Sequence, residues 1–258
     1  MPDYVTFIAS GCFSEQALNC ITSLGFDTDR VACRAKLPIG GRLQRAKGVW
    51  HLLSVTNFIL DVVRLGFLIE WDDELPHVPH DGKNPLATED RKILDNEVAN
   101  MLKKDVIRLP DTSIPGVVSG YFAGPKKAKG KLCPIEVYQL FHNIWKFRIS
   151  TTVKVVRWVR RDYYFTSITS RTHTLSSPSD NIIYEYLTVM FRLRPSARKF
   201  TKLMAALIVF LRQQLRILII TYINNLLIQA ADEQTCRLHA EITILVLQDL
   251  GYGVNFGK

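Results

Sequence analysis

A short polar tip between two apolar runs constrains this chain more than any other feature of its sequence. Residues 217–222 and 226–228 form the two runs, and only Ile223, Asn224 and Asn225 separate them. Consecutive asparagines tolerate the left-handed backbone conformations that tight turns require. The pattern therefore predicts a buried β-hairpin.

Amphipathic helices are predicted on both sides of this hairpin. Residues 197–215 carry apolar side chains at helical spacing, which favours a buried helix. After the hairpin, Asp232 can cap a helix that Gly251 ends. The apolar face of the first helix consists of Phe200, Leu203, Met204, Leu207, Ile208 and Leu211.

The first half of the chain predicts two further helices. Residues 88–104 begin with Thr88 as a potential N-cap, with acidic residues in the first turn and lysines in the last, as the helix dipole favours. Residues 49–65 follow a helical spacing, and Gly66 supplies a C-cap. Residues 1–39 show no clear period and are interpreted as a poorly specified leader.

Strands are predicted between the helices. Residues 117–123 and 132–137 flank a basic, glycine-bounded turn, which indicates a hairpin with cations at its tip. Residues 154–167 are rich in Val, Trp, Tyr and Phe and predict a strand leading into a turn, and residues 182–188 predict another. The mixture of elements indicates an α+β fold.

Positive charge is concentrated in the middle of the chain. The net charge is +9, but residues 121–216 hold 18 Lys and Arg against 4 acidic residues, and the remainder is net negative. A basic region of this size is typical of a surface that follows phosphates, although solvated Lys and Arg side chains explain the count equally well.

Several other classes of protein are disfavoured. Five cysteines without a paired C-x-x-C spacing suggest neither a disulfide framework nor a zinc module, so a reducing compartment, cytoplasmic or nuclear, fits best. The His77-x-x-His80 pair lacks a third metal ligand. The longest apolar stretch, residues 203–211, is far shorter than a membrane span, so no membrane partner is expected.

Six segments, in order along the chain, carry a resemblance to a known family. They are Gly40-Gly-Arg-Leu43, residues 94–107 ending Leu-Lys-Lys-Asp-Val-Ile, Ser119-Gly-Tyr-Phe-Ala-Gly-Pro-Lys-Lys127, Lys146-Phe-Arg-Ile149, Arg198-Lys-Phe-Thr-Lys-Leu203 and Leu250-Gly-Tyr-Gly-Val-Asn255. Together they resemble the reverse transcriptases of DIRS-type, tyrosine-recombinase retroelements. The resemblance implies a right-hand polymerase with fingers at about 88–150 and a palm at about 151–258, truncated before or at the thumb, in a domain covering residues 40–258.

The same resemblance implies that the catalytic carboxylates have been lost. In the family, a strand ending in L-D-L-K-D-A-Y-F brings the first catalytic aspartate, and residues 158–165 are matched to it with Val159 at the aspartate's place. A hairpin bearing Y-x-D-D brings the others, and it is matched by Tyr222-Ile223-Asn224-Asn225. Active members use two Mg²⁺ ions, which prefer anionic oxygen ligands, so no metal site and no cofactor are expected here.

Remnants of nucleotide binding accompany further departures from the family pattern. Lys126, Lys127, Asp162, Tyr164 and Tyr222 match family positions near the nucleotide, and Tyr164 falls at the family's steric gate against ribonucleotides. A half-buried strand aromatic is the simpler interpretation of Tyr164. The departures are Arg192 in place of a glycine in L-P-F-G-L and Cys133 in place of the arginine of W-R-P.

The sequence supports one leading function and two alternatives. The leading interpretation is a reverse-transcriptase-like domain of retroelement origin without polymerase activity, a pseudoenzyme of the RNA-directed DNA polymerase family. One alternative is a nucleic-acid-binding module that holds a template-primer weakly and without sequence preference. The other is an active polymerase with a rearranged metal site.

Overall fold

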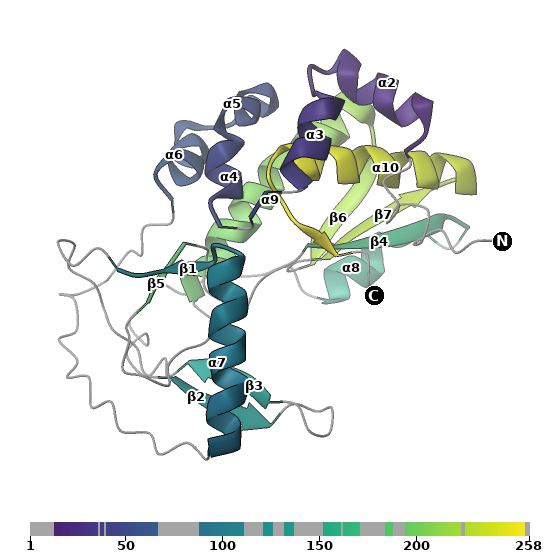
Figure 1. Cartoon of the computed structure of the whole chain (residues 1–258). Coiled ribbons are helices and arrows are strands. Elements are labelled where there is room, and N and C mark those ends of the chain that lie inside the picture. The colour runs from purple at the N-terminus through teal and green to yellow at the C-terminus, as the bar shows by residue number, and fades with distance from the viewer. Residues whose placement is uncertain are drawn as a thin grey trace.

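The structure is a computed structural model that combines helices with small antiparallel sheets (Figure 1). It describes residues 13–35, 37–38, 40–66, 88–110, 121–125, 132–136, 152–160, 162–170, 184–187, 194–222 and 225–255.

A four-stranded antiparallel sheet with the strand order β6-β7-β4-β8 organises the main body. The predicted hairpin is confirmed: β6 (Leu218–Tyr222) pairs with β7 (Asn225–Ala230), and Tyr222 is the partner of Asn225. β7 also pairs with β4 (Tyr164–Ser170), and β8 (Val254–Asn255) pairs only with the last two residues of β4. The first half of β4 is therefore an edge of this sheet.

Two long helices cover one face of the sheet. These are α9 (Arg194–Leu215) and α10 (Glu233–Asp249), both predicted from the sequence, and they lie together on one side of the strands in Figure 1. Ile219, Leu226 and Ile228 are fully buried beneath them, and Asp232 caps α10 by accepting a hydrogen bond from the Thr235 N–H at 2.8 Å. Burial of these apolar side chains is the main favourable term in the stability of this layer.

Helices α2 (Glu15–Ser23) and α3 (Thr28–Ala35) pack on the outer side of α10. Ala17, Ile21 and Val31 join the main core, which explains why residues 240–247 of α10 are buried on every side. This differs from the poorly specified leader that the sequence suggested for residues 1–39. The apolar positions of these short helices are too few to give a clear period in the sequence.

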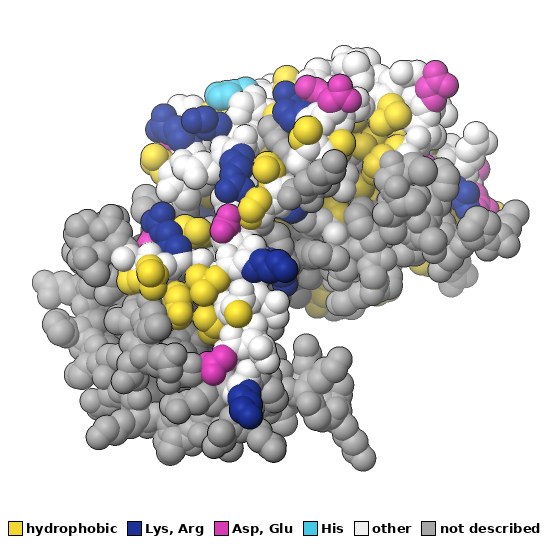
Figure 2. All heavy atoms as spheres, viewed as in Figure 1, with side chains coloured by type: hydrophobic (Ala, Val, Ile, Leu, Met, Phe, Trp, Pro, Cys, Tyr) yellow, Lys and Arg dark blue, Asp and Glu magenta, His cyan; other side chains and the backbone are white. Residues whose placement is uncertain are grey.

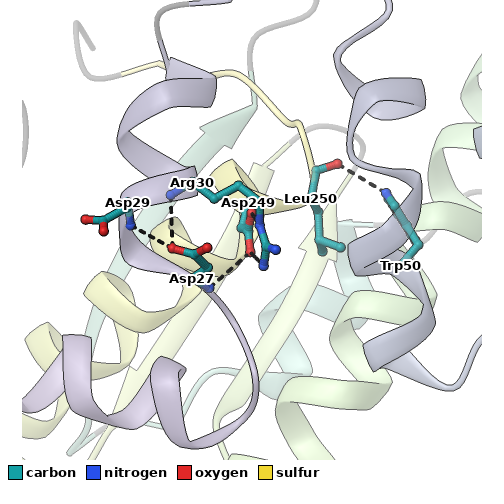
Figure 3. A network of polar contacts seen from close by, with 6 residues as sticks. All are labelled: Asp27, Asp29, Arg30, Trp50, Asp249 and Leu250. Atoms are coloured by element: carbon teal, nitrogen blue, oxygen red, sulfur yellow. Dashed lines mark hydrogen bonds and ion pairs between the residues drawn. The ribbon is translucent and has the colours of Figure 1, made fainter.

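An ion pair fixes α3 to α10 (Figure 3). The Arg30 guanidinium donates to both carboxylate oxygens of Asp249, at 2.8 and 2.9 Å, and Asp249 is fully buried. The pair raises the pKa of Arg30, chiefly through the hydrogen bond. Close by, the Trp50 indole N–H donates to the Leu250 carbonyl at 3.2 Å, so the end of α10 is held from two sides.

The predicted helix over residues 49–65 is divided. The segment contains the end of α5 (Lys47–Trp50), the 3₁₀ turn η1 (His51–Leu53) and α6 (Asn57–Leu65), and the short helix α4 (Arg42–Arg45) precedes it. Ser54, with a φ of 50°, interrupts it in the left-handed region, whereas Gly66 ends α6 as predicted. The interruption lets Trp50 and Val63 both enter the core.

A second, smaller hydrophobic cluster forms around α7 (Thr88–Lys103), which agrees with the predicted helix. It consists of Val98, Met101, Val106 and Ile107, with Tyr184 packed against them. The short strands β1 (Ile107–Arg108) and β5 (Glu185–Tyr186) pair beside it, and β5 is shorter than the predicted strand. The two strands of the predicted hairpin are present as β2 (Tyr121–Pro125) and β3 (Leu132–Glu136), and its basic turn lies outside the described residues.

The predicted strand over residues 154–167 is wrong in its first half. Residues 152–158 form helix α8 (Thr152–Trp158), and β4 begins only at Tyr164. The intrinsic preference of Val and Trp for strands is weak and is overridden by tertiary context. Here the place beside β7 is filled by residues 164–169, so the preceding segment forms a helix that contacts β6.

Candidate functional site

The candidate site is the end of the main sheet where the β6–β7 hairpin turns. In the strand register Tyr222 pairs with Asn225, Asn225 with Thr169, and Thr169 with Asn255, so these four positions form one row across the sheet. Cα atoms of paired residues in antiparallel strands are about 4.5–5.5 Å apart. The row therefore brings together residues that are far apart in the sequence.

The residue types in this row are neutral. A phenol, two amides and one hydroxyl occupy the four positions, and none of them carries the negative charge that Mg²⁺ or Mn²⁺ prefers. Within the part of the chain that the structure describes, no group of three or more His, Cys, Asp or Glu side chains is arranged to hold a metal ion.

Val159 does not lie in this row, so its predicted place on a strand beside the hairpin tip is wrong. It follows α8, and the segment around it is bound to Gln229 of β7: the Arg160 N–H donates to Gln229 Oε1 at 3.1 Å, and Gln229 Nε2 donates to the Trp158 carbonyl at 3.2 Å. Gln229 is four residues from Asn225 along β7, which corresponds to about 13 Å. Val159 therefore lies toward the opposite end of the sheet.

The position beside the hairpin tip belongs to Thr169. Sequence reasoning did not single out Thr169, because its place beside Asn225 follows from the pairing of β4 with β7. The local signal was weak, since in Ile168-Thr169-Ser170-Arg171 only Ile168 and Arg171 are similar to the first and fourth residues of the L-D-L-K pattern.

The other predicted site residues are not brought together. Asp162 is exposed and precedes β4, and Tyr164, 52% exposed, pairs with Ala230 at the end of β7 away from the tip. Tyr222 and Asn225 do lie in the row. Asn224, Lys126 and Lys127 lie outside the described residues, as do Cys133's side chain and Arg192.

This sheet, with a hairpin next to β4 and two helices on one face, can be compared with known proteins. No protein-family model and no curated protein matches the chain in sequence. A solved structure of the prototype foamy virus protease-reverse transcriptase matches 68% of this chain with a TM-score of 0.53 and 15% sequence identity. The fold is similar to part of a reverse transcriptase. The chain corresponds to 24% of the foamy virus chain's length.

Four of the six sequence segments that resembled reverse transcriptases meet in this fold. The Gly40 N–H donates to the Lys104 carbonyl at 3.4 Å, which joins the first segment to the second. Gly251 lies against the backbone of Arg42, and the Tyr252 ring is 6.1 Å from the ring of Phe200, which joins the last segment to the first and the fifth. The contacts explain why small and aromatic residues stand at these places.

The basic central region is only partly available to a ligand. Lys199 is buried and lies 5.0 Å from the centre of the Phe58 ring, Lys202 lies 4.2 Å from the same ring, and Arg212 donates to the Ile219 carbonyl at 3.0 Å. On the face shown in Figure 2, the described Lys and Arg side chains stand in separate groups rather than in one band. That face also shows apolar side chains where α7 meets β1, and Leu102 and Leu109 are exposed there.

No helix in the described ranges combines the length and the apolar character that crossing a membrane requires.

Proposed function

We propose that this chain is a reverse-transcriptase-like domain of retroelement origin, of the DIRS type that its sequence resembles, and that it does not polymerise nucleotides. The observation that carries the proposal is the row of Tyr222, Asn225, Thr169 and Asn255 across the sheet. It has the strand arrangement expected around a polymerase centre and neutral residues where the metal ligands of the active family are expected. The similarity of fold to part of a reverse transcriptase supports the same class.

Within this proposal, Thr169 takes the place of the first catalytic aspartate and Val159 does not. Asn224 and Asn225 take the places of the second pair, as the hairpin motif implied. Neutral hydroxyl and amide oxygens can touch a metal ion but cannot offset its charge, and metal stabilisation of the transition state is worth several kcal/mol. Since each 1.36 kcal/mol corresponds to a factor of ten in rate, loss of the site leaves negligible polymerisation.

Two further substitutions seen in the sequence agree with an inactive domain. Arg192 replaces a glycine that the family uses to let the backbone approach the nucleotide, and Cys133 replaces an arginine that contacts the triphosphate. Both are inferences from the resemblance. They predict that restoring the carboxylates alone does not restore rapid synthesis.

A nucleic-acid-binding role without chemistry is the second candidate function. It is favoured by the 18 Lys and Arg between residues 121 and 216, several of which are exposed, and by the fold similarity to a reverse transcriptase. Binding of this kind is independent of sequence and weakens steeply as salt rises. An active polymerase with a rearranged metal site is disfavoured because Asp162, the described acid closest in sequence to β4, is exposed at the wrong end of that strand.

Primer extension tests the proposal directly. The full chain is incubated with a primed RNA template, deoxynucleotides and either Mg²⁺ or Mn²⁺, and no extension above background is expected. A reverse transcriptase assayed in parallel confirms the template and nucleotides. Extension by the unmodified chain that is lost in Asp162→Ala would show instead that a rearranged metal site is active.

A further inference from the structure

A second surface, on the opposite end of the main sheet from the hairpin tip, combines exposed cations with an exposed aromatic ring. It is formed by Lys154 and Arg157 of α8, Arg160 after it, and Phe165 of β4, and is here called the α8–β4 surface. All four side chains are exposed, and Phe165 is 63% exposed. A single exposed phenylalanine is ordinary, but a ring beside three exposed cations offers a ligand both positive charge and a flat apolar face.

The strand register shows that these residues lie on one face. Side chains alternate between the two faces of a strand, so Gln229 points away from the α10-covered face that contains Ile228. Phe165 is the β4 partner of Gln229 and therefore shares its face. The amide of Gln229 binds the backbone of Trp158 and Arg160, which places the end of α8 beside Phe165.

The cations of this surface are directed to solvent by the same arrangement. Lys154 and Arg157 are three residues apart on α8 and so lie on one side of the helix, while Val155 and Trp158 are half-buried. The Arg160 guanidinium lies 5.2 Å from the centre of the Tyr163 ring, and its Nη1 donates to the Tyr163 hydroxyl at 3.1 Å. This contact holds a planar cation in a defined orientation at the surface.

The positive charge of the α8–β4 surface is not cancelled by acidic side chains on the same face of the sheet. Asp162 is the one acid among residues 152–165. Asp232 and Glu233 follow β7 at the same end of the sheet, but they belong to the start of α10, which covers the other face. Asp232 caps that helix, and Glu233 pairs with Arg237 at 3.3 Å.

We infer that the α8–β4 surface binds single-stranded nucleic acid, with Arg157 and Arg160 contacting phosphates and a base stacking on Phe165. Cations beside an exposed ring are the combination that single-strand-binding surfaces use, because every base offers a face for stacking. In a duplex the bases are already stacked on one another, so an aromatic ring gains nothing from a double strand. The inference depends on the proposed function only for the class of partner, since this surface lies away from the hairpin tip.

Fluorescence anisotropy with the full chain and a labelled oligothymidylate of about 16 nucleotides, the upper end of known site sizes, tests the inference. Arg157→Ala combined with Arg160→Ala removes two phosphate contacts, so the slope of log K against log salt is expected to decrease in magnitude by about 1.4. Lys47→Ala combined with Arg64→Ala removes the same charge from α5 and α6, where Lys47 and Arg64 are also exposed, and is expected to leave the slope unchanged.

The ring is tested separately from the charge. Phe165→Leu is expected to weaken binding about 5- to 100-fold at an unchanged salt slope, whereas Phe165→Tyr keeps the stacking face and the affinity. Circular dichroism confirms that each variant is folded, as the exposure of the altered side chains leads us to expect.

Four results would overturn the inference: arginine variants that behave like the control pair, a Phe165→Leu variant with unchanged affinity, a duplex that displaces the oligothymidylate as well as a single strand does, or displacement by polyglutamate. Any of them leaves the outcome of primer extension untouched, so failure of this inference is distinguishable from failure of the proposed function. Absence of binding by the unmodified chain at low salt would remove both this surface and the nucleic-acid-binding role.

Discussion

At the residue scale, two buried polar atoms stand out, His239 Nδ1 and the hydroxyl of Tyr252. Neither has a hydrogen-bond partner within the described part of the chain. Burial lowers the pKa of His239 and raises that of Tyr252, because a buried site disfavours the charged form of each group. Asp232 opposes the effect on His239 but does not outweigh it. Both side chains therefore stay neutral at pH 7.

The lowered pKa of His239 predicts a loss of stability in mild acid. Because the folded-state pKa lies below the unfolded value of about 6.5, the unfolded chain binds the proton more readily, and stability falls as pH decreases from about 6.5 toward the folded-state pKa. One such group contributes at most about 1.4 kcal/mol per pH unit. His239→Leu is expected to reduce this pH dependence, measured as the difference in urea midpoint between about pH 7.5 and about pH 5.5. Equal differences in both proteins would assign the acid sensitivity to other groups.

At the scale of elements, backbone contacts between distant segments hold the main body together. Gly251 follows α10 with a φ of 90°, and a Cβ atom at this position would lie 2.6 Å from the Arg42 carbonyl oxygen. Glycine alone accepts both the conformation and the approach without strain. The junction of α4 with the end of α10 therefore depends on the absence of a side chain here.

Replacing Gly251 is expected to lower the stability of the fold, whereas a matched replacement of Gly48 is not. Gly251→Ala is expected to destabilise the fold by about 1–3 kcal/mol from the backbone conformation, and by more once the contact with Arg42 is included. Gly48→Ala, within α5, meets no atom within 4 Å and is expected to be neutral or to stabilise by up to about 1 kcal/mol. Chemical denaturation of both variants measures the difference. A Gly251→Ala variant as stable as the unmodified chain would mean that α4 and α10 separate at little cost.

Elements with local signals could be predicted from the sequence, and elements defined by distant contacts could not. The capping residues Asp232 and Gly66 and the polar tip between β6 and β7 act within a few residues, so they marked their elements correctly. Helix α8 has the composition of a strand, and only its contacts with β6 and Gln229 decide otherwise. The position of Thr169 beside Asn225 depends on pairing across 56 residues of sequence, which no local pattern contains.

At the scale of the whole molecule, two surfaces lie at opposite ends of the same face of the sheet. In the proposed function the row at the hairpin tip takes the place of a polymerase centre, and its residues are neutral, whereas the α8–β4 surface carries exposed cations. The internal contacts of Lys199, Lys202 and Arg212 show that part of the basic charge serves the fold. The excess of positive charge in the central region therefore does not measure how strongly the chain binds phosphates. That affinity depends on the cations that are exposed on one face.

The sheet topology predicts which restored carboxylates can share a metal ion. Thr169→Asp with Asn224→Asp and Asn225→Asp places a carboxylate on each of two directly paired strand positions, with Cα atoms about 4.5–5.5 Å apart. Val159→Asp with the same two hairpin changes adds equal charge, but the backbone on either side of Val159 is bound to Gln229, which is about 13 Å from Asn225 along β7. A carboxylate at position 159 is therefore not expected to share one ion with the hairpin carboxylates.

The first triple variant is therefore expected to bind Mn²⁺ at least about tenfold more tightly than the second, a difference of about 1.4 kcal/mol, in a titration followed by electron paramagnetic resonance. Because the two variants have the same net charge, non-specific attraction of the cation cancels in the comparison. Neither variant is expected to extend a primer rapidly, since Arg192 and Cys133 are unchanged. Equal Mn²⁺ affinity in the two variants would contradict the assignment of Thr169. Rapid extension by the Thr169→Asp variant would support that assignment and show that the carboxylates were the only lesion that mattered.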